Sequence, residues 1–261
     1  MTWFVEHFFA PLGAYKPAGM FTWPHIVAFI VCMLLIRGAF SVSKNIPWKS
    51  VIKITRLLAV VLTALELVKI GYNFYYGYTD LDSWLPLSYC SLFIYACWMS
   101  GYGKGWLKKV GDAYITIGAL AGGVMFLLVP TTSLMRYPIW HFLSCYSLLF
   151  HSMMLYLSAM YIGHHCVALD RTNYRYFSFY FLLAAFISVS INSALGTNLM
   201  ILRDPYNVPL TFIHELQANS QTLYTLLATL CYLFLPALFS GFVGVRIDRY
   251  QEKQALEIDH I

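Results

Sequence analysis

The stretch that decides the fold is GDAYITIGALAGGVMFLLVP, which runs from Gly111 to Pro130. Beyond Asp112 it contains no charged residue. A helix rises ~1.5 Å per residue, so about 20 apolar residues cross the ~30 Å hydrocarbon layer of a membrane. The stretch therefore predicts a membrane-spanning helix.

The same pattern recurs along the chain. Long apolar runs, separated by connectors that contain proline, glycine and polar residues, predict seven spans: 22–41, 54–77, 84–101, 111–130, 138–162, 176–201 and 219–243. The expected fold class is all-α, a polytopic membrane helical bundle with seven transmembrane helices over residues 1–245. Residues 246–261 are expected to form a polar cytoplasmic tail.

The N-terminal residues 1–18 do not look like a signal peptide, because they lack a basic start and a long apolar run. We expect them to form an interfacial segment, whose aromatic residues face lipid. These aromatic residues are Trp3, Phe4, Phe8 and Phe9.

The composition agrees with lipid as the surrounding solvent. Only 11% of the 261 residues are charged, against about 25% in a soluble domain, and 59% are hydrophobic. The formal charge of +5 does not indicate a nucleic-acid partner, since the position of basic residues matters more than their sum in a membrane protein. The six cysteines form no CxxC pair, so we expect no disulfide framework, and we expect no cofactor.

The basic residues predict the orientation of the bundle. Connectors on one side, with the tail, carry 13 lysines and arginines, whereas the other side carries Lys16, Arg136 and Arg203. Basic residues favour the cytoplasmic side. The N-terminus is therefore expected outside and the C-terminus in the cytoplasm, in a multi-pass protein of the cytoplasmic (plasma) membrane.

Polar side chains within the spans gather in the expected outer half of the membrane. Helical rise places Cys90 at ~9 Å, His151 at ~20 Å and Asn192 at ~14 Å from the outer edge. The other members of this polar set are Glu66, Lys69, Ser88, His141, Asn198 and Gln221. Polar groups at membrane depth are costly and are functional candidates. Each also has a plainer interpretation: Glu66 and Lys69 can pair on one helix face, the amides can join helices, and Cys90 can simply pack.

Together these residue types suit nucleophilic catalysis. A thiolate attacks an ester carbonyl, while an imidazole takes the thiol proton and a carboxylate or amide orients the imidazole. Cys90 is the expected nucleophile and His151 the expected base, with His141 as the substitute base. Asn198, Asn192, Glu66, Lys69, Ser88 and Gln221 are the expected substrate-binding residues.

Three separated stretches carry a family resemblance. They are ELVKIGYNFYYGYTDLDSWLPLSYC, GGVMFLLVPTTSLMRYPIWHFLSCYSLLFHSMMLY and INSALGTNLMILRDP. Together they resemble blocks of the YwaF family of seven-helix bacterial membrane proteins over roughly residues 60–205. The resemblance puts Cys90 on the cysteine of the family's LPLHLC block, His151 on its fifth-helix histidine and Asn198 on its asparagine.

The resemblance implies a function as well as a fold. The YwaF family is similar to eukaryotic cysteine-dependent transmembrane phospholipid acyltransferases, so it implies an enzyme that transfers or hydrolyses a fatty acyl ester of a membrane lipid. Two positions depart from the family pattern: Ser88 stands where a histidine is common, and Leu199 replaces a tyrosine. The first departure removes a possible extra base.

Two other functions remain open from the sequence. A zinc hydrolase needs about three protein ligands, but His141 and His151 lie ~15 Å apart along one helix and no HxxxH pair lies at depth. A non-enzymatic binder or transporter of a small solute or lipid could use the same polar pocket, although no span shows a clear break or a two-half repeat. The oligomeric state and the exact substrate do not follow from the sequence.

Overall fold

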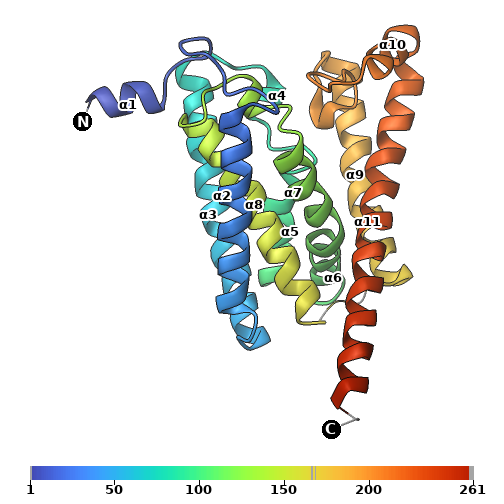
Figure 1. Ribbon diagram of the computed structural model, residues 1–261. Coiled ribbons are helices and arrows are strands. Elements are labelled where there is room, and N and C mark those ends of the chain that lie inside the picture. The colour runs from blue at the N-terminus through green and yellow to red at the C-terminus, as the bar shows by residue number, and fades with distance from the viewer. Residues whose placement is uncertain (1, 166, 168, 259–261) are drawn as a thin grey trace.

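The apolar runs form helices in the computed structural model, which is an all-helical bundle with no β-strand in the part that it describes (Figure 1). It describes residues 2–165, 167 and 169–258, without the side chains of Thr2 and of 245–258. The long helices are α2 (Trp23–Ser43), α3 (Trp48–Tyr75), α8 (Phe142–Gly163), α9 (Arg171–Leu195) and α11 (Gln221–Ile258). The shorter helices are α1 (Thr2–Phe8), α4 (Leu81–Trp84), α5 (Leu92–Tyr102), α6 (Gly105–Ala113), α7 (Ala119–Leu128) and α10 (Thr211–Asn219).

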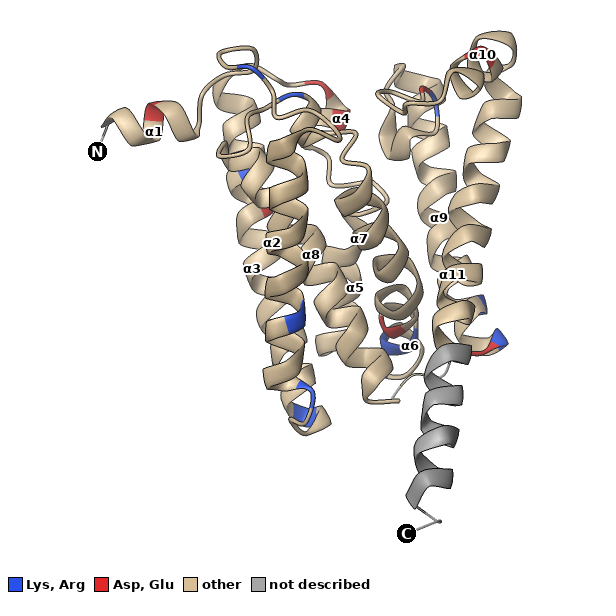
Figure 2. Ribbon diagram, viewed as in Figure 1, with Lys and Arg blue, Asp and Glu red and all other residues tan. Residues whose placement is uncertain are grey.

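Three further turns of helix are not α-helical. A π-helix, η1 (Tyr114–Gly118), joins α6 to α7, and two 3₁₀ turns are η2 (Ser133–Met135) and η3 (Leu199–Ile201). Helices α1, α4 and α10 lie at one end of the bundle, called here the α4 end, and α6 lies near the opposite end, called the α6 end (Figure 1). Lysine, arginine, aspartate and glutamate gather mostly near these two ends (Figure 2).

Five helical segments in the described chain are long and apolar enough to cross a membrane: Trp23–Ser43, Gly105–Met135, Phe142–Gly163, Arg171–Leu195 and Gln221–Gly244. They correspond to five of the seven expected spans. The other two expected spans are α3, which is 28 residues long but carries several charges, and α5, which has only 11 residues. Seven crossings and the orientation of the termini stay predictions.

Three expected helix boundaries were wrong, and each error moves a candidate residue off a helix. The span expected at 138–162 begins as α8 at Phe142, so His141 is its N-cap residue. The span expected at 84–101 becomes helical only at Leu92, so Cys90 lies in the turn before α5. The span expected at 176–201 ends at Leu195, because Gly196 adopts a left-handed conformation with φ of 71° that stops the helix. Asn198 therefore lies in the α9–α10 loop, residues 196–210.

The segment from α6 through α7 is the centre of the bundle. In its most apolar window 78% of residues are buried, against 11% for α2 and for α11, which face outward. Glycines allow neighbouring helices to approach closely in membrane proteins. A Cβ on Gly111 would lie 2.6 Å from the carbonyl oxygen of Ala96 and from the nitrogen of Ser100, so α5 and α6 pack backbone to backbone.

The N-terminal segment is only partly as expected. Trp3 and Phe4 are exposed on α1, in agreement with an interfacial helix. Phe8 and Phe9 instead turn inward, with ring centroids 6.0 Å and 4.8 Å from that of Phe142. The side chains of the expected tail, residues 246–261, lie outside the part of the chain that the structure describes.

Candidate functional site

The turn that carries Cys90 is fixed by two serines. The hydroxyls of Ser88 and Ser91 lie 2.7 Å apart, and the Ser91 N–H donates to the Ser88 hydroxyl at 3.1 Å. The N–H of Phe93 then donates to the Cys90 carbonyl at 2.9 Å, which starts α5. Ser88 thus shapes this turn through its side chain. Cys90 itself is half-buried, and no hydrogen bond of its sulfur is present among the described residues.

The same turn is fastened to the π-helix. The Tyr114 hydroxyl donates to the Tyr89 carbonyl, and the Tyr89 hydroxyl donates to the Gly118 carbonyl at 3.3 Å. A π-helix widens the backbone ring, with the Ala119 N–H donating to the Tyr114 carbonyl five residues back. The Gly118 carbonyl at the end of this π-helix is the one that accepts from the Tyr89 hydroxyl. The residue before Cys90 is therefore held at both its backbone and its ring.

Tyrosine hydroxyls lie near the Cys90 thiol, and one of them contacts a buried carboxylate. The thiol lies within electrostatic range of the hydroxyls of Tyr114, Tyr146 and Tyr232. Tyr146 donates to Glu66 Oε2 at 2.5 Å, and Lys69 Nζ forms an ion pair with Glu66 Oε1 at 2.6 Å. The structure thus shows the predicted Glu66–Lys69 pair and links it, through Tyr146, to the surroundings of the thiol.

His151 is buried on α8 and has one free ring nitrogen. Its Nδ1 donates to the Ser147 carbonyl at 2.7 Å, so in the neutral ring the lone pair is on Nε2. Nε2 is buried and has no hydrogen-bond partner. The ring stacks on Phe126 with centroids 3.7 Å apart and planes 9° apart, and it also contacts Phe150 at 5.5 Å. No hydrogen bond joins His151 to Cys90 among the described contacts.

His141 has a structural position instead. It caps the N-terminus of α8, because its Nδ1 accepts from the Leu143 N–H at 3.1 Å. Its Nε2 donates to the Ala10 carbonyl at 2.9 Å. Both ring nitrogens of His141 are therefore occupied, whereas Nε2 of His151 has no hydrogen-bond partner among the described residues.

The three candidate amides hold the α9–α10 loop. Asn192 donates to the Leu199 carbonyl at 3.0 Å and accepts from the Leu199 N–H at 2.7 Å. Asn198 accepts from the N–H groups of Arg203 and Asp204, and Gln221 donates to the Arg203 carbonyl at 2.7 Å. These bonds keep the loop folded over the α4 end.

A buried polar chain at the α6 end was missed by the sequence analysis. The Tyr161 hydroxyl lies 3.0 Å from that of Thr55 and 2.6 Å from that of Ser100, which donates to Asp112 Oδ1 at 2.5 Å. Lys108 Nζ pairs with Asp112 Oδ2 at 2.6 Å. The chain joins α3, α5, α6 and α8. Its one visible signal is Asp112, a charge inside an apolar run.

No group of three histidine, cysteine, aspartate or glutamate side chains gathers at a metal-binding distance within the described residues. A zinc hydrolase with three protein ligands therefore has no candidate donor set in that part of the chain.

A comparison with known protein families shows to which family the chain belongs. Residues 19–239 match the TMEM164 family. The chain belongs to the TMEM164 family. Comparisons with curated proteins and with solved structures gave no match. TMEM164 proteins are a transmembrane family, so the helices α2 to α11 belong to a membrane protein.

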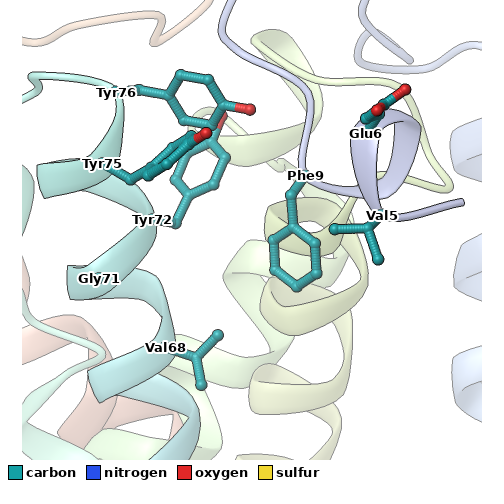
Figure 3. Close-up of a pocket in the computed structure, with 8 residues that line it drawn as sticks. All are labelled: Val5, Glu6, Phe9, Val68, Gly71, Tyr72, Tyr75 and Tyr76. Atoms are coloured by element: carbon teal, nitrogen blue, oxygen red, sulfur yellow. The ribbon is translucent and has the colours of Figure 1, made fainter. Parts of the chain in front are cut away.

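Two hollows of different kinds open on the bundle. A groove of about 340 Å³ lies between α1 and the end of α3, with Phe9 and Val5 facing the tyrosines of α3 (Figure 3). Its other lining residues are Glu6, Val68, Gly71, Tyr72, Tyr75 and Tyr76. A slot of about 160 Å³ lies between α3 and α5 and includes Glu66. Only the slot is lined wholly by residues of the TMEM164 match, since Val5, Glu6 and Phe9 precede it.

Proposed function

We propose that this member of the TMEM164 family is an integral enzyme of the cytoplasmic membrane that transfers or hydrolyses a fatty acyl ester of a membrane phospholipid through Cys90. The observation that carries the proposal is the Cys90 turn, which Tyr89 and Tyr114 fasten to a π-helix. These bonds hold the residue next to the thiol in a fixed position. The resemblance to the YwaF family, and through it to cysteine-dependent phospholipid acyltransferases, supports the same chemistry.

The reaction is a two-step displacement. His151 takes the thiol proton as the Cys90 sulfur attacks the ester carbonyl, and the tetrahedral intermediate expels the lysolipid alcohol, which receives that proton. The product is a Cys90 thioester. An acceptor hydroxyl or water then attacks the thioester, with His151 again as the base, and the thiol regains its proton. The first acceptor gives acyl transfer and the second gives hydrolysis.

His151 is the proposed base because its Nε2 lone pair is buried and unoccupied. In the absence of substrate, catalytic hydrogen bonds are often long and tighten only when substrate binds. Phe150 contacts both the His151 ring, at 5.5 Å, and the Phe93 ring of α5, at 5.9 Å, so it lies between the base and the helix that follows Cys90. We propose that substrate binding moves Phe150 and brings the imidazole to the thiol.

The Tyr146–Glu66–Lys69 chain has a supporting role in the proposal. The Tyr146 hydroxyl lies in electrostatic range of the thiol and is a donor that can turn from Glu66 to the developing oxyanion. Lys69 pairs with Glu66, and Glu66 accepts a hydrogen bond that keeps the Tyr146 hydroxyl in place. The Cys90 turn is held by Ser88, and the α9–α10 loop is held by Asn192, Asn198 and Gln221. In the proposal these residues act by positioning the two segments.

The proposal is tested with Cys90→Ser and His151→Ala variants. Each is expressed in a host that lacks the protein, and the acyl composition of its phospholipids is compared with that of cells with the wild-type chain. We expect both variants to lose the change that the wild type causes. Cys145→Ser, at an exposed cysteine, is the matched control and retains it. An unchanged acyl composition with wild-type and variant chains alike contradicts the proposal.

A binder without chemistry is the second candidate. The groove between α1 and α3 favours it, because it is the larger hollow and contains none of the proposed catalytic residues (Figure 3). A purified protein that holds a lipid with an intact ester and shows no turnover with Cys90 present would support the binder over the enzyme.

A further inference from the structure

The slot between α3 and α5 has the shape of a blind channel. One face of α3 and the start of α5 line it: Thr63, Glu66, Leu67, Ile70, Pro86, Ile94, Tyr95 and Trp98. Helices α3 and α5 run in opposite directions, so Ile70 and Pro86 mark the end near α4, while Thr63 and Trp98 mark the end toward α6. The seven residue-to-residue steps from Thr63 to Ile70 give a length of about 10 Å.

The end toward α6 is closed by a tryptophan held in place. Trp98 Nε1 donates to the Thr63 hydroxyl at 2.9 Å, and that hydroxyl donates to the Ala59 carbonyl at 2.7 Å. Both polar groups are thus satisfied inside an apolar surface. The indole ring, which is itself 38% exposed, is held at this end of the slot by that bond.

The lining fits hydrocarbon and excludes a head group. The open side is bordered by Leu67 and Tyr95, which are exposed on the apolar surface of the bundle. Glu66 is the one charged residue of the lining, and Lys69 and Tyr146 already occupy its carboxylate. The slot therefore offers apolar contacts without a free charge to a ligand that arrives sideways from the membrane.

The segment that carries Cys90 borders the slot. Pro86 and Ile94 line it, and Cys90 lies between these two residues in the sequence, in the turn before α5. Behind the lining, Tyr146 links Glu66 to the surroundings of the Cys90 sulfur.

We propose that the slot binds the acyl chain of the lipid ester that reacts at Cys90, and that Trp98 sets the length of the chain by stopping its terminal methyl group. The inference rests on the proposed function for the reaction, but the binding of the chain does not require the reaction. A hydrophobic pocket that stops a chain discriminates against one extra methylene by about tenfold or more.

The test is photo-crosslinking of the purified full chain with phospholipids that carry a diazirine at the acyl terminus, over a series of chain lengths. We expect the preferred length to label the Thr63 and Trp98 segments and longer chains to label them at least about tenfold less. Trp98→Ala removes that discrimination and shifts labelling to longer chains. Trp98→Phe retains a floor and most of the selectivity. Trp106→Ala, at an exposed tryptophan on α6, leaves it unchanged.

Two outcomes separate this inference from the proposed function. Equal labelling of α2, α11 and the slot at every chain length, with no change in Trp98→Ala, overturns the slot. Selective labelling of the slot that persists in Cys90→Ser supports it. If that variant also keeps acyl turnover, the proposed function fails while the slot stands.

Discussion

The hydroxyl of Tyr114 donates a hydrogen bond to the backbone carbonyl of Tyr89, and the Tyr89 hydroxyl returns the contact by donating to Gly118 of the same π-helix. Both rings are buried. The exchange joins an irregular turn to the most buried helical segment of the bundle. It fixes the backbone on which the Cys90 thiol depends.

Removal of this bond should loosen the turn. Tyr114→Phe leaves the Tyr89 carbonyl buried without its donor, which costs about 1–3 kcal/mol of unfolding free energy. We expect a lower unfolding temperature in detergent and faster alkylation of Cys90 by a maleimide, read by mass spectrometry. Tyr75→Phe, at an exposed ring on α3, is the control and should change neither quantity. Unaltered alkylation in Tyr114→Phe would show that the bond does not control the turn.

The polar chain at the α6 end should contribute to stability rather than to chemistry. Asp112→Ala removes the acceptor of Ser100 and the partner of Lys108. Leaving buried hydroxyls unpaired costs about 1–3 kcal/mol. Denaturant unfolding of the purified protein measures this loss, and Asp80→Ala, at an exposed residue whose side chain makes no cap bond, should be neutral. A large loss in acyl turnover without a loss in stability would contradict this role.

The contact of α5 with α6 should tolerate no added side chain. Gly111→Ala places a methyl group 2.6 Å from two backbone atoms, so the helices must separate. Overpacking of this kind costs about 1–3 kcal/mol. Gly38→Ala, on α2 with open space around its Cβ position, should be neutral or slightly stabilising. Thermal unfolding compares the two variants, and equal unfolding temperatures would refute the close packing.

Asn192 should keep the α9–α10 loop closed. Asn192→Ala removes its bonds to Leu199 and to the Thr197 hydroxyl, so the loop opens more often. We expect faster trypsin cleavage at Arg203, the basic residue of the loop. Asn207→Ala removes a single bond to the Thr131 carbonyl and serves as the control. Cleavage rates that match in the two variants would argue against the role of Asn192.

Variants of His151 and His141 should distinguish a catalytic role from a structural role. His151→Phe, which keeps a ring packed on Phe126, should lower acyl turnover by about 10²–10⁴-fold, as expected for loss of a general base, with little change in unfolding temperature. His141→Ala should lower stability by about 0.5–2 kcal/mol through loss of the α8 cap. Turnover and thermal unfolding are measured on both purified variants. A loss of turnover in the His141 variant and a loss of stability in the His151 variant would instead assign the base to His141 and the structural role to His151.

Part of the fold follows directly from the sequence. Apolar runs of span length gave the positions of the long helices, and Gly196 signals the end of α9, although the expected span ran past it. The late start of α5 was less visible. It depends on Pro86 and on hydroxyl bonds between Ser88 and Ser91, which compete with the helix backbone.

The candidate site was harder to predict, because its contacts join residues far apart in sequence. Helical depth grouped Glu66 with Cys90, but it could not show that Tyr146 lies between them. Depth favoured His151 over His141 as the base, but it could not show that a backbone cap occupies the ring of His141 and that aromatic stacking holds the ring of His151. A tyrosine such as Tyr161 within an apolar run does not indicate, from the sequence, that its hydroxyl joins a buried hydrogen-bond chain.

The most direct measurement of the central claim is intact-protein mass spectrometry of the purified protein after incubation with phospholipid. We predict an added acyl mass that hydroxylamine removes, that peptide mapping locates at Cys90, and that Cys90→Ser lacks. Acyl turnover that persists in Cys90→Ser, without any adduct at residue 90 in the wild type, would contradict the account.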